Sequence, residues 1–460
     1  MLEIFFDKGT LIAEQCIGEF NKYFKFFKWD ERIQKYRACA YHYRELILSL
    51  REKKISYIDH AKNFFPCSFI LHEKIIPRDY QVEALENWIQ CGSRGVVTLP
   101  TGAGKTILAI LAIERIGRPT LIHVPTIDLM HQWYQVLTRF FKIEIGLLGG
   151  GYHNLQTITV ATYDSALLHV PFRGNDFGFI IFDECHHLPG EQLQFTAISS
   201  IAPFRLGLTA TPERSDGKEN ILYNICGPIC YQAEIRQLEG VTLSPYEIVT
   251  KEIALSEEEK ILYDENRAKY LEFVRANNIQ FSQSNGWQQF LRIAHKTPTG
   301  KEAFQAYLKQ KKLSQASSNK AHIVWEILSK HRSDRILIFT QDNETAYNLG
   351  TRFFLPVITH HTKVKEREHF LTAFKSGEYN ILVTSKVLNE GVDVPDANVA
   401  IIVSGSGTVR EHVQRLGRIL RAKEGKRAIL YELISEGTGE YFVNQRRKQH
   451  SAYEKRTTPL

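Results

Sequence analysis

From Val96 onward, short apolar stretches rich in β-branched residues alternate with stretches that have helical spacing. Each apolar stretch ends at a glycine or a polar residue, and continuous apolar strands separated by helices are typical of a parallel sheet covered on both faces. A first series of strands is expected at residues 96–99, 120–124, 157–163, 179–183 and 205–209. A second series is expected at residues 335–339, 356–360, 380–385, 399–403 and 428–433. The pattern therefore predicts an α/β protein with two lobes.

The segments outside these two series have a different pattern. Residues 256–316 are expected to form a helical insertion, with Ser256 as its N-cap and acidic residues in the first turn. The apolar positions expected on or near one face of its first helix are Leu262, Tyr270, Phe273 and Val274. We therefore divide the chain into a small mixed N-terminal region (1–66), a first lobe (67–242), a linker with the helical insert (243–318), and a second lobe with a polar, basic tail (319–460).

Composition narrows the class of protein only slightly. The 460 residues are 43% hydrophobic and 24% charged, which is ordinary for a globular protein of two to four domains. The formal charge of +7 is compatible with a nucleic-acid partner but does not identify one. No apolar run approaches the roughly 18–20 residues that span a bilayer, and Glu3 and Asp7 interrupt any signal-peptide core. We expect a monomeric cytoplasmic protein with no membrane partner and, from its scattered cysteines, no disulfide framework.

The segment LPTGAGKT (residues 99–106) follows an apolar strand and precedes a helical stretch. At such a turn, backbone N–H groups and the helix dipole converge on a phosphate. Lys105 would reach the β- and γ-phosphates, and the hydroxyl of Thr106 would bind Mg²⁺. Leu99 replaces the first glycine of the general pattern, so a chance glycine turn is the alternative interpretation. The candidate nucleotide-binding residues are Thr101, Gly102, Ala103, Gly104, Lys105 and Thr106.

The segment FIIFDECHH (residues 179–187) ends an expected buried strand with two adjacent carboxylates. Mg²⁺ prefers oxygen ligands, so Asp183 is its candidate partner, through water. Glu184 would then orient or deprotonate the attacking water. A zinc site at Cys185, His186 and His187 is the alternative, but adjacent side chains on an extended segment diverge, and neither HExxH nor a paired C-x-x-C accompanies them.

The segment QRLGRILR (residues 414–421) places Arg415, Arg418 and Arg421 along one side of an expected helix. Such an arginine cluster is usually a solvated face. Beside a nucleotide, however, arginines stabilise phosphoryl transfer by a factor on the order of 10³ or more. We take Gln414, Arg418 and Arg421 as candidate catalytic residues, with ATP bound between the lobes and hydrolysis coupled to their opening.

In their order along the chain, LPTGAGKT, DECH, LTATP (208–212) and QRLGRILR resemble motifs I, II, III and VI of superfamily 2 helicases. This resemblance implies two RecA-like lobes that use ATP and Mg²⁺. IPRDYQ (76–81) resembles the adenine-reading Q motif, which implies contacts from Arg78 and Gln81. VLNEGVDVPDAN (387–398) resembles motif V, which implies that Gly391 and Asp393 lie at the nucleotide.

A closer similarity is to the XPB (xeroderma pigmentosum group B) family, especially its compact archaeal-type members. It rests on SIAPFRLGLTATPERSDG (200–217), VPDANVAIIVSGSG (394–407) and LYELISEGTGE (430–440). The resemblance implies a damage-recognition-like N-terminal region, a thumb-like insert, and 3′→5′ DNA unwinding or translocation in nucleotide excision repair or transcription. It also implies a Bax1-like nuclease partner, and association with the nucleoid if the source is a prokaryote.

The chain departs from that family at a loop associated with duplex opening. The family carries Arg-Glu-Asp after motif III, whereas this chain has Arg214, Ser215 and Asp216. Arg214 and Asp216 remain candidates for duplex opening. Loss of the middle carboxylate leaves the ATPase chemistry intact but makes strand separation less certain.

The insert interleaves basic and aromatic residues, a pattern that lets bases stack on rings while amines contact phosphates, at ~1–3 kcal/mol for each stacking contact. The alternative is that Tyr263, Tyr270 and Phe273 form core. The interleaved residues are Arg267, Lys269, Tyr270, Arg275, Trp287, Arg292, Lys296, Lys309, Lys311 and Lys312. The glycine-rich stretch 146–151 is expected to be a flexible loop.

Three functions remain open at this point. The first is a DNA-stimulated ATPase that translocates and opens duplex DNA. The second is an RNA helicase, because nothing in the motifs reads the 2′-hydroxyl. The third is an ATP-gated DNA clamp or scaffold that recruits a nuclease without processive unwinding, which Ser215 slightly favours. A small-molecule kinase would explain neither the second lobe nor the arginine segment.

Overall fold

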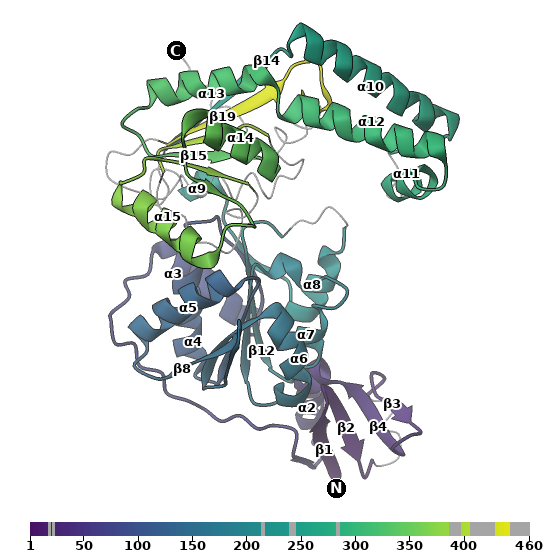
Figure 1. The fold of residues 1–460 in the computed structure, drawn as a ribbon. Coiled ribbons are helices and arrows are strands. Elements are labelled where there is room, and N and C mark those ends of the chain that lie inside the picture. The colour runs from purple at the N-terminus through teal and green to yellow at the C-terminus, as the bar shows by residue number, and fades with distance from the viewer. Residues whose placement is uncertain are drawn as a thin grey trace. The chain divides into compact units, whose positions relative to one another are not determined.

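The computed structural model describes residues 1–16, 20, 24–212, 217–238, 245–281, 286–385, 397–404 and 428–441. The described chain forms two compact units, which divide after Ala233 and are treated separately below (Figure 1). No helix in these ranges is both long enough and apolar enough to cross a membrane.

The N-terminal region folds as a mixed sheet packed on helix α2. The sheet order is β3-β4-β2-β1-β5, in which β1 pairs antiparallel with β2 and parallel with β5. Lys8 (φ 47°) and Gly9 (φ 77°) form the tight turn between β1 and β2, where a positive φ is required. The elements are β1 (Leu2–Asp7), β2 (Thr10–Glu14), β3 (Lys28–Asp30), β4 (Lys35–Cys39), η1 (Ala40–His42), α2 (Tyr43–Glu52) and β5 (Tyr57–Asp59).

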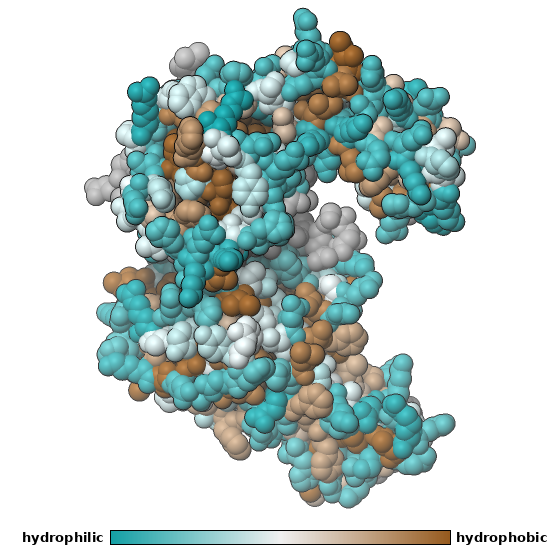
Figure 2. Space-filling model, viewed as in Figure 1, coloured by the Kyte–Doolittle hydropathy of each residue, from teal (hydrophilic) through white to brown (hydrophobic). Residues whose placement is uncertain are grey.

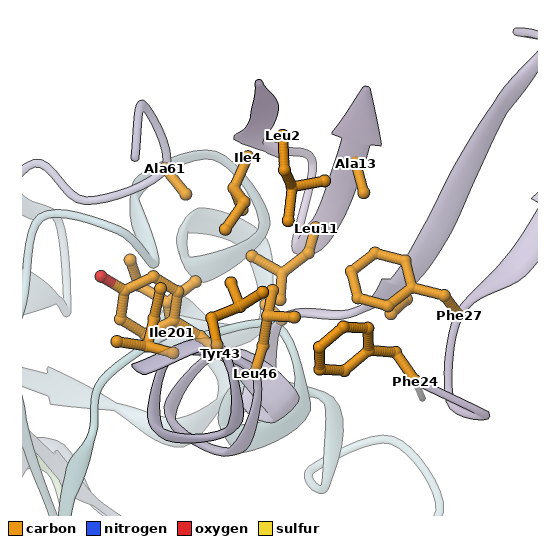
Figure 3. Close-up of a cluster of buried hydrophobic side chains, with 14 of the residues drawn as sticks. Leu2, Ile4, Leu11, Ala13, Phe24, Phe27, Tyr43, Leu46, Ala61 and Ile201 are labelled. Carbon is orange, nitrogen blue, oxygen red and sulfur yellow. The ribbon is translucent and has the colours of Figure 1, made fainter. Parts of the chain in front are cut away.

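The core of this region also contains a residue from the first lobe. Alternate residues of β1 and β2 point inward onto α2, as the period of a strand requires. Ile201, which lies outside the region in sequence, is buried in the same cluster (Figure 3). Arg44 of α2 donates to the main-chain oxygens of Gly92 (2.6 Å) and Pro203 (3.0 Å). The N-terminal region and the first lobe therefore share a continuous core and a hydrogen-bonded junction.

The first lobe is a parallel sheet in the order β13-β6-β12-β11-β7-β10-β8-β9, with β9 alone antiparallel to its neighbour β8. Helices α4 and α5 lie on one face, and α6, α7 and α8 lie on the other (Figure 1). The central strands are buried along their whole length, which explains their uninterrupted apolar sequences. The strands are β6 (Arg94–Thr98), β7 (Thr120–Val124), β8 (Ile145–Gly149), β9 (Tyr152–Asn154), β10 (Ile158–Thr162), β11 (Phe179–Asp183), β12 (Phe204–Thr209) and β13 (Ile229–Gln232). The helices are α3 (Asp79–Gln90), α4 (Lys105–Ile116), α5 (Ile127–Phe140), α6 (Tyr163–Arg173), η2 (Cys185–His187), α7 (Phe195–Ile198) and α8 (Glu219–Cys226).

The second unit contains the other parallel sheet, in the order β14-β19-β18-β15-β17-β16. Its strands are β14 (Tyr246–Ile253), β15 (Ile336–Phe339), β16 (Val357–Ile358), β17 (Ile381–Thr384), β18 (Val399–Ile402) and β19 (Ala428–Ser435). Its helices are α9 (Ile235–Leu238), α10 (Glu257–Ala276), α11 (Gly286–Ala294), α12 (Pro298–Gln315), α13 (Ser318–Lys330), α14 (Asn343–Phe353) and α15 (Val364–Ser376).

The helical insertion is confirmed as α10, α11 and α12. Ser256 caps α10 with its side chain, which accepts a hydrogen bond from Glu259 N at 3.2 Å. Phe290 is fully buried at the centre of the insert, and Tyr270 and Phe273 pack around it. The insert is joined to the second sheet, because the Tyr263 hydroxyl accepts a hydrogen bond from Gly439 N at 3.0 Å.

Three sequence expectations differ from the structure. Residues 146–151 were expected as a flexible loop, but Ile145–Gly149 form the buried strand β8, and only Gly150 and Gly151 turn the chain. Leu262 is exposed, and its neighbour Tyr263 is the buried residue on that turn of α10. Strand β14 was not predicted, because its sequence YEIVTKEI lies in the segment interpreted as a linker.

Exposed apolar residues of α10 lie among hydrophilic ones on the surface of the insert (Figure 2).

Candidate nucleotide-binding site

The turn between β6 and α4 has the geometry of a phosphate-binding loop. Gly102 (φ 86°) and Gly104 (φ 80°) adopt conformations that side chains disfavour. A Cβ at Gly104 would lie 2.5 Å from Nε2 of Gln81 and would displace that amide, so glycine here suits both the backbone conformation and the position of Gln81. Lys105 is the first residue of α4, and Thr106 follows it. The first-turn N–H groups of α4 therefore face the turn, where an anion is favoured.

Several buried polar atoms beside this turn lack a hydrogen-bond partner among the described residues. They include the hydroxyls of Thr98, Thr101 and Thr211 and the Oε2 atom of Glu184. Buried polar atoms are nearly always satisfied in folded proteins, so a group of exceptions indicates a ligand site. Hydroxyl and carboxylate oxygens are the ligands that Mg²⁺ prefers, and they also accept hydrogen bonds from its bound water molecules. The residues therefore fit a magnesium–nucleotide complex. That Thr106 and Asp183 would hold the metal stays a prediction.

Asp183 lies at the carboxyl end of β11, and its carboxylate is held by two donors. Trp133 Nε1 donates to Oδ2 at 2.8 Å, and Glu184 N donates to Oδ1 at 3.0 Å. Burial raises the pKa of Asp183 to about 6, the charge of Glu184 adds to that rise, and the nearby ammonium of Lys105 opposes it. The structure thus brings together the lysine and the two carboxylates that the sequence singled out.

Glu184 has a left-handed backbone (φ 47°, ψ 51°). For a residue with a side chain this conformation is strained, and such strain concentrates at functional sites. The hydroxyl of Tyr163 donates to the main-chain oxygen of Asp183 at 3.0 Å and helps to hold the turn. The strained backbone turns Glu184 away from the direction of the strand, so the two neighbouring carboxylates can take different roles.

His186 connects the carboxylate segment to the next strand. Its Nδ1 lies 3.0 Å from the hydroxyl of Thr209 at the end of β12 and 3.5 Å from Glu184 Oε2. Thr209 in turn accepts from Thr211 N at 3.2 Å. The DECH and LTATP segments are therefore joined by side-chain contacts, as well as by the pairing of β11 with β12.

The segment IPRDYQ supports the phosphate loop from one side. Gln81 Nε2 donates to the main-chain oxygens of Ala103 (3.3 Å) and Gly104 (3.2 Å), and Tyr80 donates to Ala103 O at 2.7 Å. Arg78 N donates to Gln81 Oε1 at 3.0 Å, which fixes the orientation of the amide. The contact of Arg78 and Gln81 with an adenine ring stays a prediction. Support of the loop by Tyr80 was not anticipated, although the residue lies inside the motif.

Several predicted residues lie outside the described ranges. The candidates for duplex opening, Arg214 and Asp216, are among them, as are the motif V residues Gly391 and Asp393. The candidate catalytic residues Gln414, Arg418 and Arg421 also lie there. Their roles stay predictions. Trp133 is another residue that the sequence did not identify, because its position on the apolar face of a helix is explained by packing alone.

Comparison with known proteins gives the family. Residues 4–61 match the model of the xeroderma pigmentosum group B helicase damage recognition domain, residues 74–214 the type III restriction enzyme res subunit, and residues 298–453 the ERCC3/RAD25/XPB C-terminal helicase. The DNA 3′-5′ translocase XPB2 of Sulfurisphaera tokodaii is 39% identical over 422 residues, covering 92% of this chain and 95% of that protein. The chain belongs to the XPB helicase family.

More distant members of the XPB family are longer than this chain. The DNA 3′-5′ helicase XPB of Kineococcus radiotolerans is 33% identical over 78% of this chain and 60% of that protein. In Saccharomyces cerevisiae, the general transcription and DNA repair factor IIH helicase/translocase subunit XPB/SSL2 is 26% identical over 81% of this chain and 43% of that protein. The predicted resemblance is therefore confirmed, and membership of a helicase family implies the use of ATP.

Proposed function

We propose that this XPB-family protein is an ATP-dependent DNA translocase of 3′→5′ polarity that opens DNA during repair or transcription. The observation that carries the proposal is the assembly in one lobe of the glycine turn, Lys105, the strained Asp183–Glu184 pair and the His186–Thr209 link. The relatives named above as DNA 3′-5′ helicases or translocases supply the polarity and the polymer.

The first lobe supplies most of the chemistry of hydrolysis in this proposal. The amides of the turn and Lys105 bind the phosphates, and Thr106 and Asp183 hold Mg²⁺, which neutralises phosphate charge when it is bound. Glu184 accepts a proton from the attacking water, a role that suits a carboxylate whose Oε2 has no hydrogen-bond partner in the described structure. Arg418 and Arg421 of the second lobe would then stabilise the charge of the transition state, with Gln414 beside them.

The link from Glu184 through His186 to Thr209 would report the state of the nucleotide to the segment after β12. That segment includes Arg214 and Asp216, the candidates for duplex opening. The insert would contact the displaced strand, and Trp287 is a candidate for stacking on a base because it is 40% exposed while Phe290 is buried.

An ATP-gated DNA clamp is the second candidate function, and Ser215 is the observation that favours it. In that case ATP binding would close the protein on DNA, and a Bax1-like nuclease partner would act on the held substrate. We propose a monomer in either case, located at the nucleoid if the cell is prokaryotic.

Steady-state ATPase measured without nucleic acid, and then with single-stranded DNA, forked DNA or RNA, separates the candidates. A strand-displacement assay on the fork is run in parallel, with Glu184→Gln as the inactive control. Stimulation by DNA together with displacement supports the helicase. Stimulation without displacement supports the clamp, stronger stimulation by RNA supports an RNA helicase, and no ATPase under any condition contradicts the proposal.

A further inference from the structure

Trp133 is a fully buried residue of α5 whose polar atom is directed at the carboxylate segment. Its side chain is 1% exposed, and its indole Nε1 donates to Asp183 Oδ2 at 2.8 Å. The indole N–H can only donate, and a buried tryptophan requires an acceptor for it. In this protein the acceptor is the carboxylate expected to hold the metal, although the residues are 50 positions apart.

The hydrogen bond fixes the orientation of that carboxylate. Rotation about the last torsion of an aspartate is soft, so packing alone does not set the carboxylate plane. In this structure Oδ2 accepts from Trp133 and Oδ1 accepts from Glu184 N, so each oxygen has one fixed donor. Each oxygen keeps a second lone pair for a metal ion or a metal-bound water. Removing either donor would free the plane to rotate.

The indole is itself held firmly in place. Helix α5 packs on β7, β8 and β10, and its first turn is capped by Thr126, whose hydroxyl accepts from Leu129 N at 3.2 Å. Strand β7, which leads into α5, is also the hydrogen-bonded neighbour of β11, at whose end Asp183 lies. The donor therefore lies on the helix that follows β7, and the acceptor lies at the end of β11, the strand paired with β7.

We propose that Trp133 is a positioning residue that holds the Asp183 carboxylate in the orientation needed to bind the magnesium–nucleotide complex. The inference rests on the proposed ATP site and names a residue that acts on the metal only through Asp183. Hydrogen bonds to metal-binding groups typically change metal affinity 10–100-fold when they are removed. We therefore expect loss of the indole N–H to raise the Mg²⁺ concentration for half-maximal effect by about 10–100-fold.

The test uses Trp133→Phe, which keeps an aromatic ring but has no N–H. Trp88→Phe is the matched control, because Trp88 is also 1% exposed and donates at 2.9 Å, but to the main-chain oxygen of Arg205 rather than to a carboxylate. Both variants lose one buried indole hydrogen bond, so they share the structural penalty. Trp133→Leu, which is apolar and has no hydrogen-bond donor, is measured if the Phe variant does not fold.

Binding of a non-hydrolysable ATP analogue to the full chain is measured by calorimetry in EDTA and over a series of Mg²⁺ concentrations. We expect Trp133→Phe to shift the Mg²⁺ dependence by about 10–100-fold while affinity in EDTA changes less than about threefold. Trp88→Phe should change neither. An unchanged Mg²⁺ dependence, or an equal loss of affinity in EDTA, overturns the inference. If the unmodified protein shows no Mg²⁺-dependent binding, the proposed function fails and the inference fails with it.

Discussion

Removal of one partner from the ion pair between Lys320 and Glu440 should destabilise the second unit strongly. Lys320 Nζ donates to Glu440 Oε2 at 2.7 Å and to Val403 O at 2.9 Å, and Glu440 Oε2 also accepts from Ser435 N at 3.0 Å. The side chains are 1% and 13% exposed, respectively. The lysine is therefore inaccessible to solvent and the glutamate is nearly so. The pair connects the start of α13 to the segments that follow β18 and β19.

The size of the effect follows from what each substitution leaves behind. Lys320→Met leaves a buried carboxylate with one amide donor, and removal of one partner from a buried pair costs about 3–5 kcal/mol. Glu440→Leu removes the carboxylate from an ammonium that is 1% exposed and should cost a similar amount. The double variant removes both charges, and the loss of the hydrogen bonds to Val403 O and Ser435 N costs about 1–3 kcal/mol. It should therefore be more stable than either single variant.

Differential scanning calorimetry measures these differences in the free energy of unfolding. The unfolding transition of the first unit serves as an internal reference. A loss of 3–5 kcal/mol in a unit of this size corresponds to a fall in Tm of roughly 6–20 °C. The matched control is Lys312→Met, which breaks a Lys–Glu pair of the same 2.7 Å length with Glu344, whose side chains are 63% and 61% exposed. That change should cost about 0–1 kcal/mol. If the losses of the single variants simply add in the double variant, the charges are not coupled and the reasoning is refuted.

Three further predictions concern the first lobe and the arginine segment. Lys105→Ala and Glu184→Gln should each abolish nearly all ATP hydrolysis while circular dichroism stays native, and normal turnover in either would contradict the assigned roles. Arg421→Ala should lower kcat by ~10²–10³ with ATP binding largely kept, whereas weaker binding at unchanged kcat would exclude a role in the transition state. Burial lowers the pKa of His123 to about 3. Between about pH 3 and about pH 6.5, the unfolded chain therefore binds one more proton than the folded chain. The free energy of unfolding falls by about 1.4 kcal/mol for each unit by which the pH decreases in that range. His123→Phe should flatten the fall in Tm between pH 6.5 and 5, and an unchanged slope would contradict burial as its cause.

The sequence predicted the features that depend on local pattern. Central strands such as β7 and β11 are apolar throughout because they are buried on both faces, and the glycine turn follows from the conformations that Gly102 and Gly104 must adopt. Strand β8 was missed because three glycines follow its two leucines, and this composition hides a buried strand. The Trp133–Asp183 contact could not be predicted, because it depends on how a helix packs on a sheet rather than on any spacing along the chain.

The shared core at the junction of the N-terminal region has a practical consequence for protein engineering. Ile201 is buried among side chains from β1, β2 and α2, and Arg44 satisfies two carbonyl groups of the lobe. Deleting residues 1–66 would expose that isoleucine and leave both carbonyl groups to solvent. A truncated chain would therefore be less stable at this junction. Chimeras that exchange the N-terminal region between relatives are better joined after Ala233, where the compact unit ends.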